Sequence, residues 1–235
     1  MKVAILLWGC VRGLKYQSTF DSQKKHIWDK LEDFDVYICT SNKEYDDIIH
    51  TIPNTRHIKI FDDRMSEDFI MPKTTHVIMP SYFKPFHKSN LMKCFLYQKY
   101  LRDHIVSNKL RDQYDVMITM DMAHVFESDI PDPSTIDPNI GYVSSTESFN
   151  GINPRFFMSS PSNVLFYLNK LEHIMSNPAN ISGDQVHPRH RSHGCNYHPE
   201  CSLKYYLEQV CKMTLKPIPL TFWRVRENGD VTRDE

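Results

Sequence analysis

The hydrophobic residues of this chain are arranged in short runs that are separated by stretches with helical spacing. Six runs are largely apolar in both alternating sets, as expected for strands covered on both faces: 3–8, 34–40, 58–61, 114–120, 140–144 and 156–158. Apolar residues recur at three- and four-residue steps in four stretches: 18–31, 89–109, 161–175 and 199–210. The alternation predicts an α/β fold, with a mostly parallel central sheet flanked by helices.

In the stretch 114–126, YDVMITMDMAHVF, residues 114–120 are predicted to form a central strand of that sheet. It leads into a carboxylate, Asp121, and a histidine, His124. Ligands of open α/β sheets bind beyond the carboxyl ends of the strands, so Asp121 is the first candidate site residue. The alternative is that Asp121 only caps a turn.

Two other strands are also predicted to end in residues suited to a nucleotide. Gly9 and Gly13 flank Arg12 after the first strand, where small residues let main-chain N–H groups and a guanidinium approach a phosphate. Thr40 ends the second strand and could contact a base or ribose. Lys88 and Lys93 lie at the start of the helix 89–109, where cations favour an anionic ligand. A tight turn and solvated cations are the alternatives.

Composition narrows the class of protein. The chain has 235 residues, a formal net charge of -1 and a pI near 6.9, which fits one domain and excludes the basic excess of most nucleic-acid-binding proteins. Six cysteines are too sparse for a disulfide scaffold, and no segment has the pattern of a signal peptide or a transmembrane helix. We therefore expect reduced thiols in a soluble, cytoplasmic protein.

The chain resembles the GT-A family of nucleotide-sugar glycosyltransferases, in particular small soluble members from bacterial polysaccharide clusters and large DNA viruses. The resemblance rests on the segments VAILLWGCVRG, DVYICT, MITMDMAHVF, NGINPRFFMSSP and HPECSLKYYL. It implies one catalytic domain over 1–226, with a nucleotide-binding half at 1–126 and an acceptor half at 127–226, followed by a flexible tail at 227–235. It also implies transfer of a sugar from a nucleotide-diphosphate donor, UDP being favoured, to a hydroxyl of a glycan or glycoprotein.

The metal motif of that family is incomplete here. The resemblance places a DxD motif at Asp121-Met122-Ala123, where alanine stands in place of the second aspartate. Three explanations remain open: a metal-independent enzyme, a manganese or magnesium ion held by Asp121 with His124, or a substitution that disables the site.

The resemblance also suggests roles for residues of the acceptor half. Glu200 is the candidate base that deprotonates the acceptor hydroxyl, with Glu147 in reserve, and Asn150, Asn153 and Arg155 are candidates to hold sugar hydroxyls. Simpler readings are that Glu200 complements a helix dipole and that the asparagines form turns.

Three rival functions stay open. Histidines and cysteines crowd one segment and could bind zinc as a binding module: His187, His190, His193, Cys195, His198 and Cys201. The other rivals are a nucleotidyltransferase and a noncatalytic domain that keeps this architecture.

Overall fold

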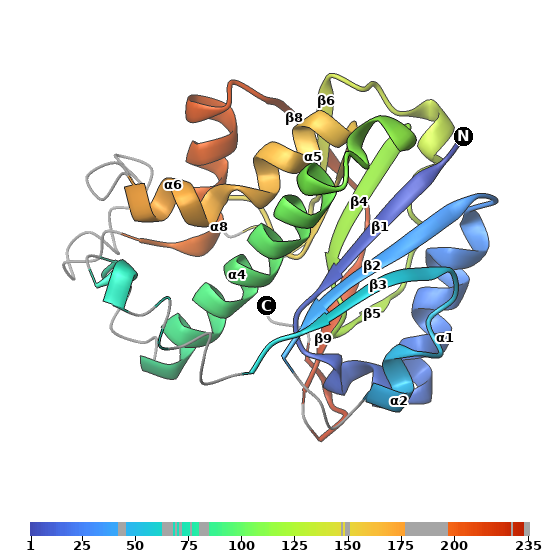
Figure 1. Ribbon diagram of the computed structural model, residues 1–235. Helices are drawn as coiled ribbons and strands as arrows, with labels where there is room; N and C mark the ends of the chain where they lie inside the picture. The colour runs from blue at the N-terminus through green and yellow to red at the C-terminus, as the bar shows by residue number, and fades with distance from the viewer. Residues whose placement is uncertain are drawn as a thin grey trace.

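We analysed a computed structural model of the protein. It describes residues 1–41, 46–62, 68, 70, 72–75, 77–79, 85–146, 148, 151–176, 197–226 and 228–232, without the side chains of residues 12, 46 and 85–87. The fold is mixed α/β, built on a seven-stranded sheet with the strand order β3-β2-β1-β4-β7-β6-β8 (Figure 1). The predicted fold class, a mostly parallel sheet flanked by helices, is confirmed.

The strands of this sheet are β1 (Val3–Trp8), β2 (Phe34–Thr40), β3 (Thr55–Ile60), β4 (Val116–Asp121), β6 (Ile140–Ser144), β7 (Phe156–Ser159) and β8 (Thr214–Ile218). Strands β1, β2, β3 and β4 pair in parallel, as do β6 and β8. Strand β7 runs antiparallel to both β4 and β6. The register places Trp8 opposite Asp121, so β1 and β4 end at the same edge of the sheet.

A second sheet of three strands was not predicted. Strand β4 ends at Asp121, where the sequence placed the end of the strand, and His124 begins a further strand, β5 (His124–Phe126). Strand β5 pairs antiparallel with β9 (Phe222–Val225), which in turn pairs with β10 (Val231–Thr232). The predicted tail 227–235 therefore contains a short strand that is hydrogen-bonded to the domain.

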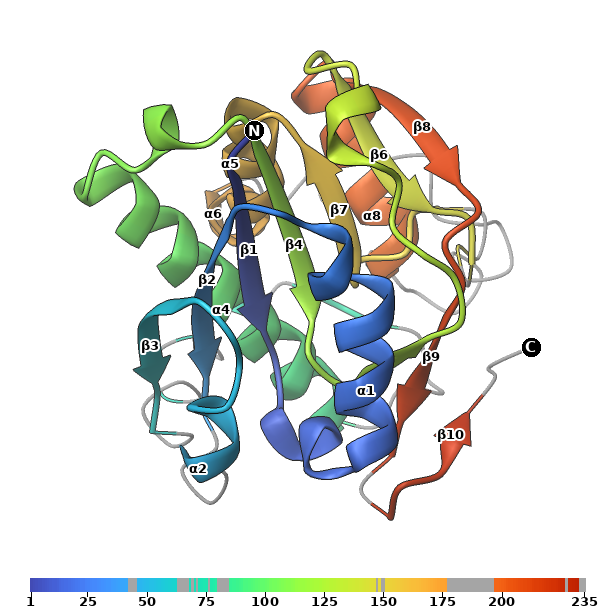
Figure 2. The same cartoon turned by 90° about the vertical axis from the view of Figure 1, so that its right-hand side faces the viewer.

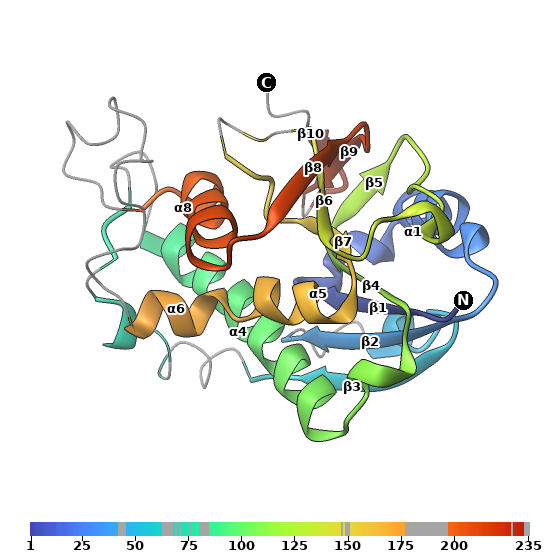
Figure 3. The same ribbon diagram turned by 90° about the horizontal axis from the view of Figure 1, so that it is seen from above.

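Helices cover both faces of the main sheet (Figures 2 and 3). On one face lie α1 (Gln17–His26) and α2 (Asp46–Ile49), with the 3-10 turns η1 (Val11–Lys15) and η2 (Trp28–Lys30). On the other lie α4 (Pro85–Ser107), α5 (Pro161–Leu168) and α6 (Lys170–Ser176). The predicted helix 199–210 is α8 (Pro199–Tyr205) followed by a π-helical turn, η8 (Tyr206–Val210).

Alternation along β1 explains this layering. Val3, Ile5 and Leu7 pack into a core with residues of α1 and η2, whereas Ala4, Leu6 and Trp8 pack with residues of α4 and α5. Asp121, opposite Trp8, follows the last buried residue of β4, Met120. Among the described residues, no helix has both the length and the apolar character needed to cross a membrane.

Candidate functional site

The centre of the candidate site is a close contact between Gly9 and Asp121. Gly9 follows β1 with φ = 106°, a conformation that favours glycine. A Cβ atom at Gly9 would lie 2.7 Å from Oδ1 of Asp121. The missing side chain therefore leaves the space that the Asp121 carboxylate occupies, and the backbone at Gly9 can reach its conformation without strain.

The loop after β1 also packs against Ala123. A Cβ atom at Gly13, in η1, would lie 2.7 Å from Cα of Ala123, so the two backbones touch. The loop after β1 and the turn after β4 are therefore in direct contact. The sequence led us to expect both segments at the same edge of the sheet. Arg12 lies in η1 between these contacts, although its side chain is outside the described part.

The turn between β4 and β5 is fixed by hydrogen bonds from three directions. The N–H of Ala123 donates to Oδ1 of Asp121 at 3.0 Å, and the N–H of Met122 donates to the carbonyl of Trp8 at 3.0 Å. Nε2 of Gln23, a fully buried side chain on α1, donates to the carbonyls of Met122 (2.8 Å) and His124 (3.0 Å). Gln23 was missed in the sequence because it reads as an ordinary polar residue of an amphipathic helix.

His124 lies beside Asp121 but deep in the protein. Its Nδ1 is 3.8 Å from Oδ2 of Asp121, its ring packs edge-on against Phe222, and only 1% of the side chain is exposed. Burial, reinforced by the charge of Arg155, holds the pKa of His124 well below its ordinary value, so the imidazole is neutral. A neutral imidazole can serve as a metal ligand.

These residues meet part of the requirement for a divalent ion. Asp121, whose side chain is 17% exposed, and His124 beside it are the residues that would hold such an ion. The described residues contain no group of three ligand side chains, so diphosphate oxygens and water would complete the shell, as is common for magnesium.

Three further residues interact with Asp121: Arg155 through the backbone, and Tyr167 of α5 and Cys94 of α4 through its charge. The carbonyl of Arg155 accepts a hydrogen bond from the N–H of Asp121 at 3.0 Å. Burial, together with the charge of Asp121, raises the pKa of the Tyr167 hydroxyl, which donates to the carbonyl of Pro154. Burial and the same charge raise the pKa of the Cys94 thiol to about 12, so this thiol is protonated.

Lys170 is a second residue that sequence reasoning missed. Its side chain lies in the core, with Nζ 3.9 Å from the centre of the Tyr167 ring and 4.8 Å from that of Phe95. Nζ has no hydrogen-bond partner among the described residues, and burial moves its pKa well below the ordinary value. The burial of Lys170 depends on how α6 packs against α4, which the sequence alone does not give.

Of the predicted donor-binding residues, Thr40 and Lys88 have structural contacts. The buried Thr40 hydroxyl donates to the carbonyl of Gly9 at 2.8 Å and so supports the loop. Nζ of Lys88 donates to the carbonyls of Thr74 (2.7 Å) and Val77 (2.8 Å). Lys93 is half-buried on α4. Direct contact of these three with a donor remains a prediction.

Of the residues predicted to bind the acceptor, Arg155 is hydrogen-bonded to Asp121 through the backbone, and Asn153 is hydrogen-bonded to Arg155. Asn153 is fully buried, and its amide donates to the carbonyl of Thr146 at 2.9 Å while Oδ1 accepts from the N–H of Arg155 at 3.0 Å. These bonds shape the loop before β7. Asn150 and the reserve base Glu147 lie outside the described residues.

Glu200 is held where that loop meets α8. The N–H of Ile152 donates to its carbonyl at 3.1 Å, and a Cβ atom at Gly151 would collide with its backbone. Its Oε2 lies 3.2 Å from Nδ1 of His198, and its side chain is 12% exposed. The loop 151–155 therefore links Glu200 to Asp121 through Arg155.

Most of the proposed zinc-binding segment lies outside the described residues. His187, His190, His193 and Cys195 lie outside the described residues, whereas Cys201 is buried in α8 and His198 pairs with Glu200. None of the five described cysteines forms a disulfide: Cys10, Cys39, Cys94, Cys201 and Cys211.

Comparison with known proteins supports the fold. No protein family and no curated protein sequence matches the chain. Among solved structures, the apo form of mouse xyloside xylosyltransferase 1 is similar, with a TM-score of 0.51 and 8% sequence identity, over 93% of this chain and 85% of that one. At this identity the likeness concerns the fold alone: the chain has a GT-A-like, Rossmann-type architecture.

Proposed function

We propose that the protein is a glycosyltransferase that moves a sugar from a nucleotide-diphosphate donor to a hydroxyl of a glycan or glycoprotein. The observation that carries the proposal is the contact of the Gly9–Gly13 loop with the Asp121–Ala123 turn at the carboxyl edge of β1 and β4. That edge is where α/β folds bind ligands. The fold likeness to a xylosyltransferase supports the same class of enzyme.

In the proposed reaction, the acceptor oxygen bonds to the anomeric carbon of the sugar while the bond from that carbon to the diphosphate breaks. Main-chain N–H groups of the Gly9–Gly13 loop and the Arg12 guanidinium receive the phosphates, since both are suited to anions. Asp121, with His124 beside it, would hold a divalent ion, manganese or magnesium, and such an ion would supply positive charge for the departing diphosphate. UDP is the favoured nucleotide.

Glu200 is the proposed base in the inverting form of this reaction. It takes the proton of the acceptor hydroxyl as the new bond forms. Its support is the hydrogen bond that its carbonyl accepts from the loop 151–155, which also adjoins Asp121, and the position of Nδ1 of His198, 3.2 Å from Oε2. Asn153 shapes this loop, and Arg155 with Asn150 would hold sugar hydroxyls.

Thermal unfolding with a panel of nucleoside diphosphates, with and without manganese, tests the proposal. A ligand present at 100 times its dissociation constant stabilises the native state by about 2.7 kcal/mol. For a chain of this size, such a gain raises the midpoint by about 5–10 °C. No shift with any nucleoside diphosphate, with or without metal, would favour the noncatalytic binding domain.

Asp121→Asn should remove the manganese-dependent part of this shift and reduce donor hydrolysis by about 100-fold, as for loss of one charge-stabilising group. Asp112→Asn is the matched control, because Asp112 precedes β4 and its side chain is 91% exposed. Equal hydrolysis by both variants would exclude Asp121 from the site.

A further inference from the structure

Strand β3 leaves one edge of the main sheet unpaired. It is the outermost strand of the sheet and, within the described residues, it pairs with β2 alone (Figure 2). The N–H of Phe61, directly after β3, donates to the carbonyl of Thr40 in β2. Because hydrogen-bonding groups alternate in direction along a strand, the N–H and C=O groups of Ile58 and Ile60 point away from β2. No main-chain hydrogen bond from another described segment reaches them.

The other outer strands of the two described sheets are blocked or very short. At the opposite margin of the main sheet, β8 contains Pro217, which has no N–H group to donate. In the second sheet, β10 has two residues, and the N–H of Phe126 in β5 donates to the Ser22 hydroxyl of α1. Strand β3 has six residues without proline, all of them half-buried or exposed. It is therefore the described edge best suited to accept a further strand.

On the α4 side of the sheet, β3 presents a positive charge. Nζ of Lys59 lies 5.3 Å from the centre of the Phe61 ring and 5.8 Å from that of the Tyr100 ring in α4. Lys59 forms no ion pair with the described residues, and the sequence of β3, TRHIKI, contains no acid. The other strongly basic residue of the strand, Arg56, is already paired with Asp35. An acidic side chain on a neighbouring strand would therefore give Lys59 a partner that the described fold does not supply.

On the opposite side of the sheet, β3 presents apolar side chains. Ile58 and Ile60 pack against the core that includes residues of α1, but both remain partly exposed at the edge. Side chains of an added strand alternate between the two faces and lie beside those of β3. The complementary segment therefore alternates acidic residues, on the side of Lys59, with apolar residues, on the side of Ile58 and Ile60.

We propose that β3 binds an extended segment of a partner protein, in which acidic and apolar residues alternate, as a further strand of the main sheet. Main-chain hydrogen bonds to Ile58 and Ile60 supply affinity, and the charge of Lys59 selects acidic sequences. A second copy of this chain fits the edge poorly, because two β3 strands would bring Arg56 and Lys59 close to like charges. This interaction does not depend on the proposed transfer reaction.

Two peptides of opposite charge test the proposal by NMR. The peptides (Glu-Val)₄ and (Lys-Val)₄ are titrated to millimolar concentration into the ¹⁵N-labelled full-length protein. We expect the acidic peptide to shift the amide signals of β3 saturably and to slow hydrogen exchange at the outward-pointing N–H groups of Ile58 and Ile60. The N–H of Phe61, which is already bonded to Thr40, should change little. The basic peptide should produce neither effect.

Lys59→Gln should weaken binding of the acidic peptide several-fold while keeping the fold, since Lys59 is a half-buried residue of an edge strand. Lys216→Gln is the matched control, because Lys216 lies on the edge strand β8 with Nζ 5.8 Å from the centre of the Tyr142 ring. It should bind the peptide as the wild type does.

Several results would overturn the proposal: no binding of the acidic peptide, equal binding of both peptides, or equal affinity of the wild type and Lys59→Gln. Slow exchange at Ile58 and Ile60 that depends on protein concentration without peptide would also overturn it, because a second copy would then occupy the edge. Nucleotide binding is measured separately, so each of these results leaves the transferase proposal to its own test.

Discussion

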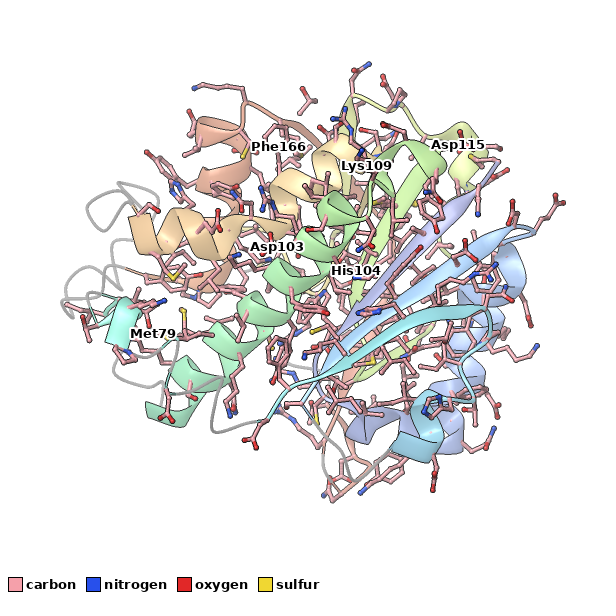
Figure 4. All side chains as sticks on the ribbon, in the orientation of Figure 1. Met79, Asp103, His104, Lys109, Asp115 and Phe166 are labelled. Carbon is pink, nitrogen blue, oxygen red and sulfur yellow. The ribbon has the colours of Figure 1, made fainter. Side chains whose placement is uncertain are left out.

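An aspartate lies at each end of the central sheet, and the two aspartates have different surroundings. At the amino end, Asp35 of β2 is enclosed: Lys2 lies 3.0 Å and Arg56 2.5 Å from its oxygens, and the Tyr114 hydroxyl donates at 2.9 Å. At the carboxyl end, Asp121 accepts from the N–H of Ala123 and faces a glycine. Figure 4 labels Asp115, which precedes β4 and lies at the same end as Asp35.

This difference distinguishes a structural carboxylate, Asp35, from a candidate functional one, Asp121. Burial raises the pKa of Asp35, but hydrogen bonds from Arg56, Lys2 and Tyr114 outweigh it and hold that pKa below its ordinary value. Its neighbours thus stabilise the charged form within the fold. Around Asp121, by contrast, a glycine with positive φ lets the backbone lie directly against the carboxylate, and 17% of the Asp121 side chain is exposed.

Gly9→Ala should have the largest effect on this comparison. The new methyl group would require an unfavourable backbone conformation, costing about 1–3 kcal/mol, and would displace the Asp121 carboxylate. We expect both a lower unfolding midpoint and a loss of donor hydrolysis of about 10-fold or more, as for a small misplacement of a catalytic group.

Gly229→Ala is the matched control for this variant. Gly229 also has positive φ, at 90°, but its added Cβ would meet the Tyr16 ring. It should lower the midpoint and leave nucleotide binding intact. If both variants lose nucleotide binding equally, the space at Gly9 has no special connection with the ligand.

Asp35→Asn should reduce stability but not nucleotide binding. Removing the buried charge weakens its hydrogen bonds with Lys2, Arg56 and Tyr114, for which we expect about 1–3 kcal/mol loss in the free energy of unfolding at pH 7. Because the folded pKa is lowered, the wild-type contribution is present above about pH 4 and disappears as pH falls through the folded pKa.

Urea unfolding at pH 7 and at pH 3 measures this effect. The difference between wild type and Asp35→Asn should shrink at the lower pH, where protonation of this carboxyl in the unfolded chain removes part of the wild-type contribution. A constant difference would show that the lost charge is not the cause. A fall in nucleotide affinity would mean that the two ends of the sheet are coupled.

The smallest effect is expected for the pH dependence of stability that arises from a stacked histidine pair on the face of α4. His57 of β3 and His104 of α4 (Figure 4) stack with ring centroids 3.8 Å apart. Burial lowers the pKa of both, and the charges of His104 and Lys59 add to the shift at His57. Since the unfolded chain binds protons first, stability should decline as pH falls below about 6.5.

His104→Gln should make this decline shallower between about pH 7 and pH 5, as measured by urea unfolding across that range. The buried His124, whose pKa is also lowered, retains its own contribution in the variant. His50→Gln, at an exposed position after α2, should leave the decline unchanged. An identical pH profile for wild type and His104→Gln would exclude the stacked pair as its source.

Much of the fold could be predicted from local patterns. Strands β1, β2 and β6 have the predicted bounds, because β1 and β2 are buried along their whole length and β6 is buried after its first residue. The predicted helix 89–109 corresponds to most of α4. The short strand β5 after Asp121 was not predicted. Met122 and Ala123 continue the apolar run, and the chain turns there because Gln23 and Trp8 hydrogen-bond to its backbone from distant parts of the sequence.

The candidate site was predictable where it consists of strand ends. Gly9, Gly13 and Asp121 follow buried strands, and the parallel pairing of β1 with β4 brings them together. Lys170 and Gln23 could not be identified in this way, because their importance arises from burial against α4, α5 and β5, which spacing along one helix does not encode.

By itself the sequence determined the alternation of strands and helices and the residues at each strand end, since hydrophobic period and turn chemistry are local properties. Only the tertiary structure decided which strands are neighbours, that β7 runs antiparallel, and that His124 belongs to a second sheet. It also decided that Asp35 is enclosed by cations while Asp121 faces a glycine. The reason is that contacts between distant segments depend on packing, and packing is a property of the whole chain.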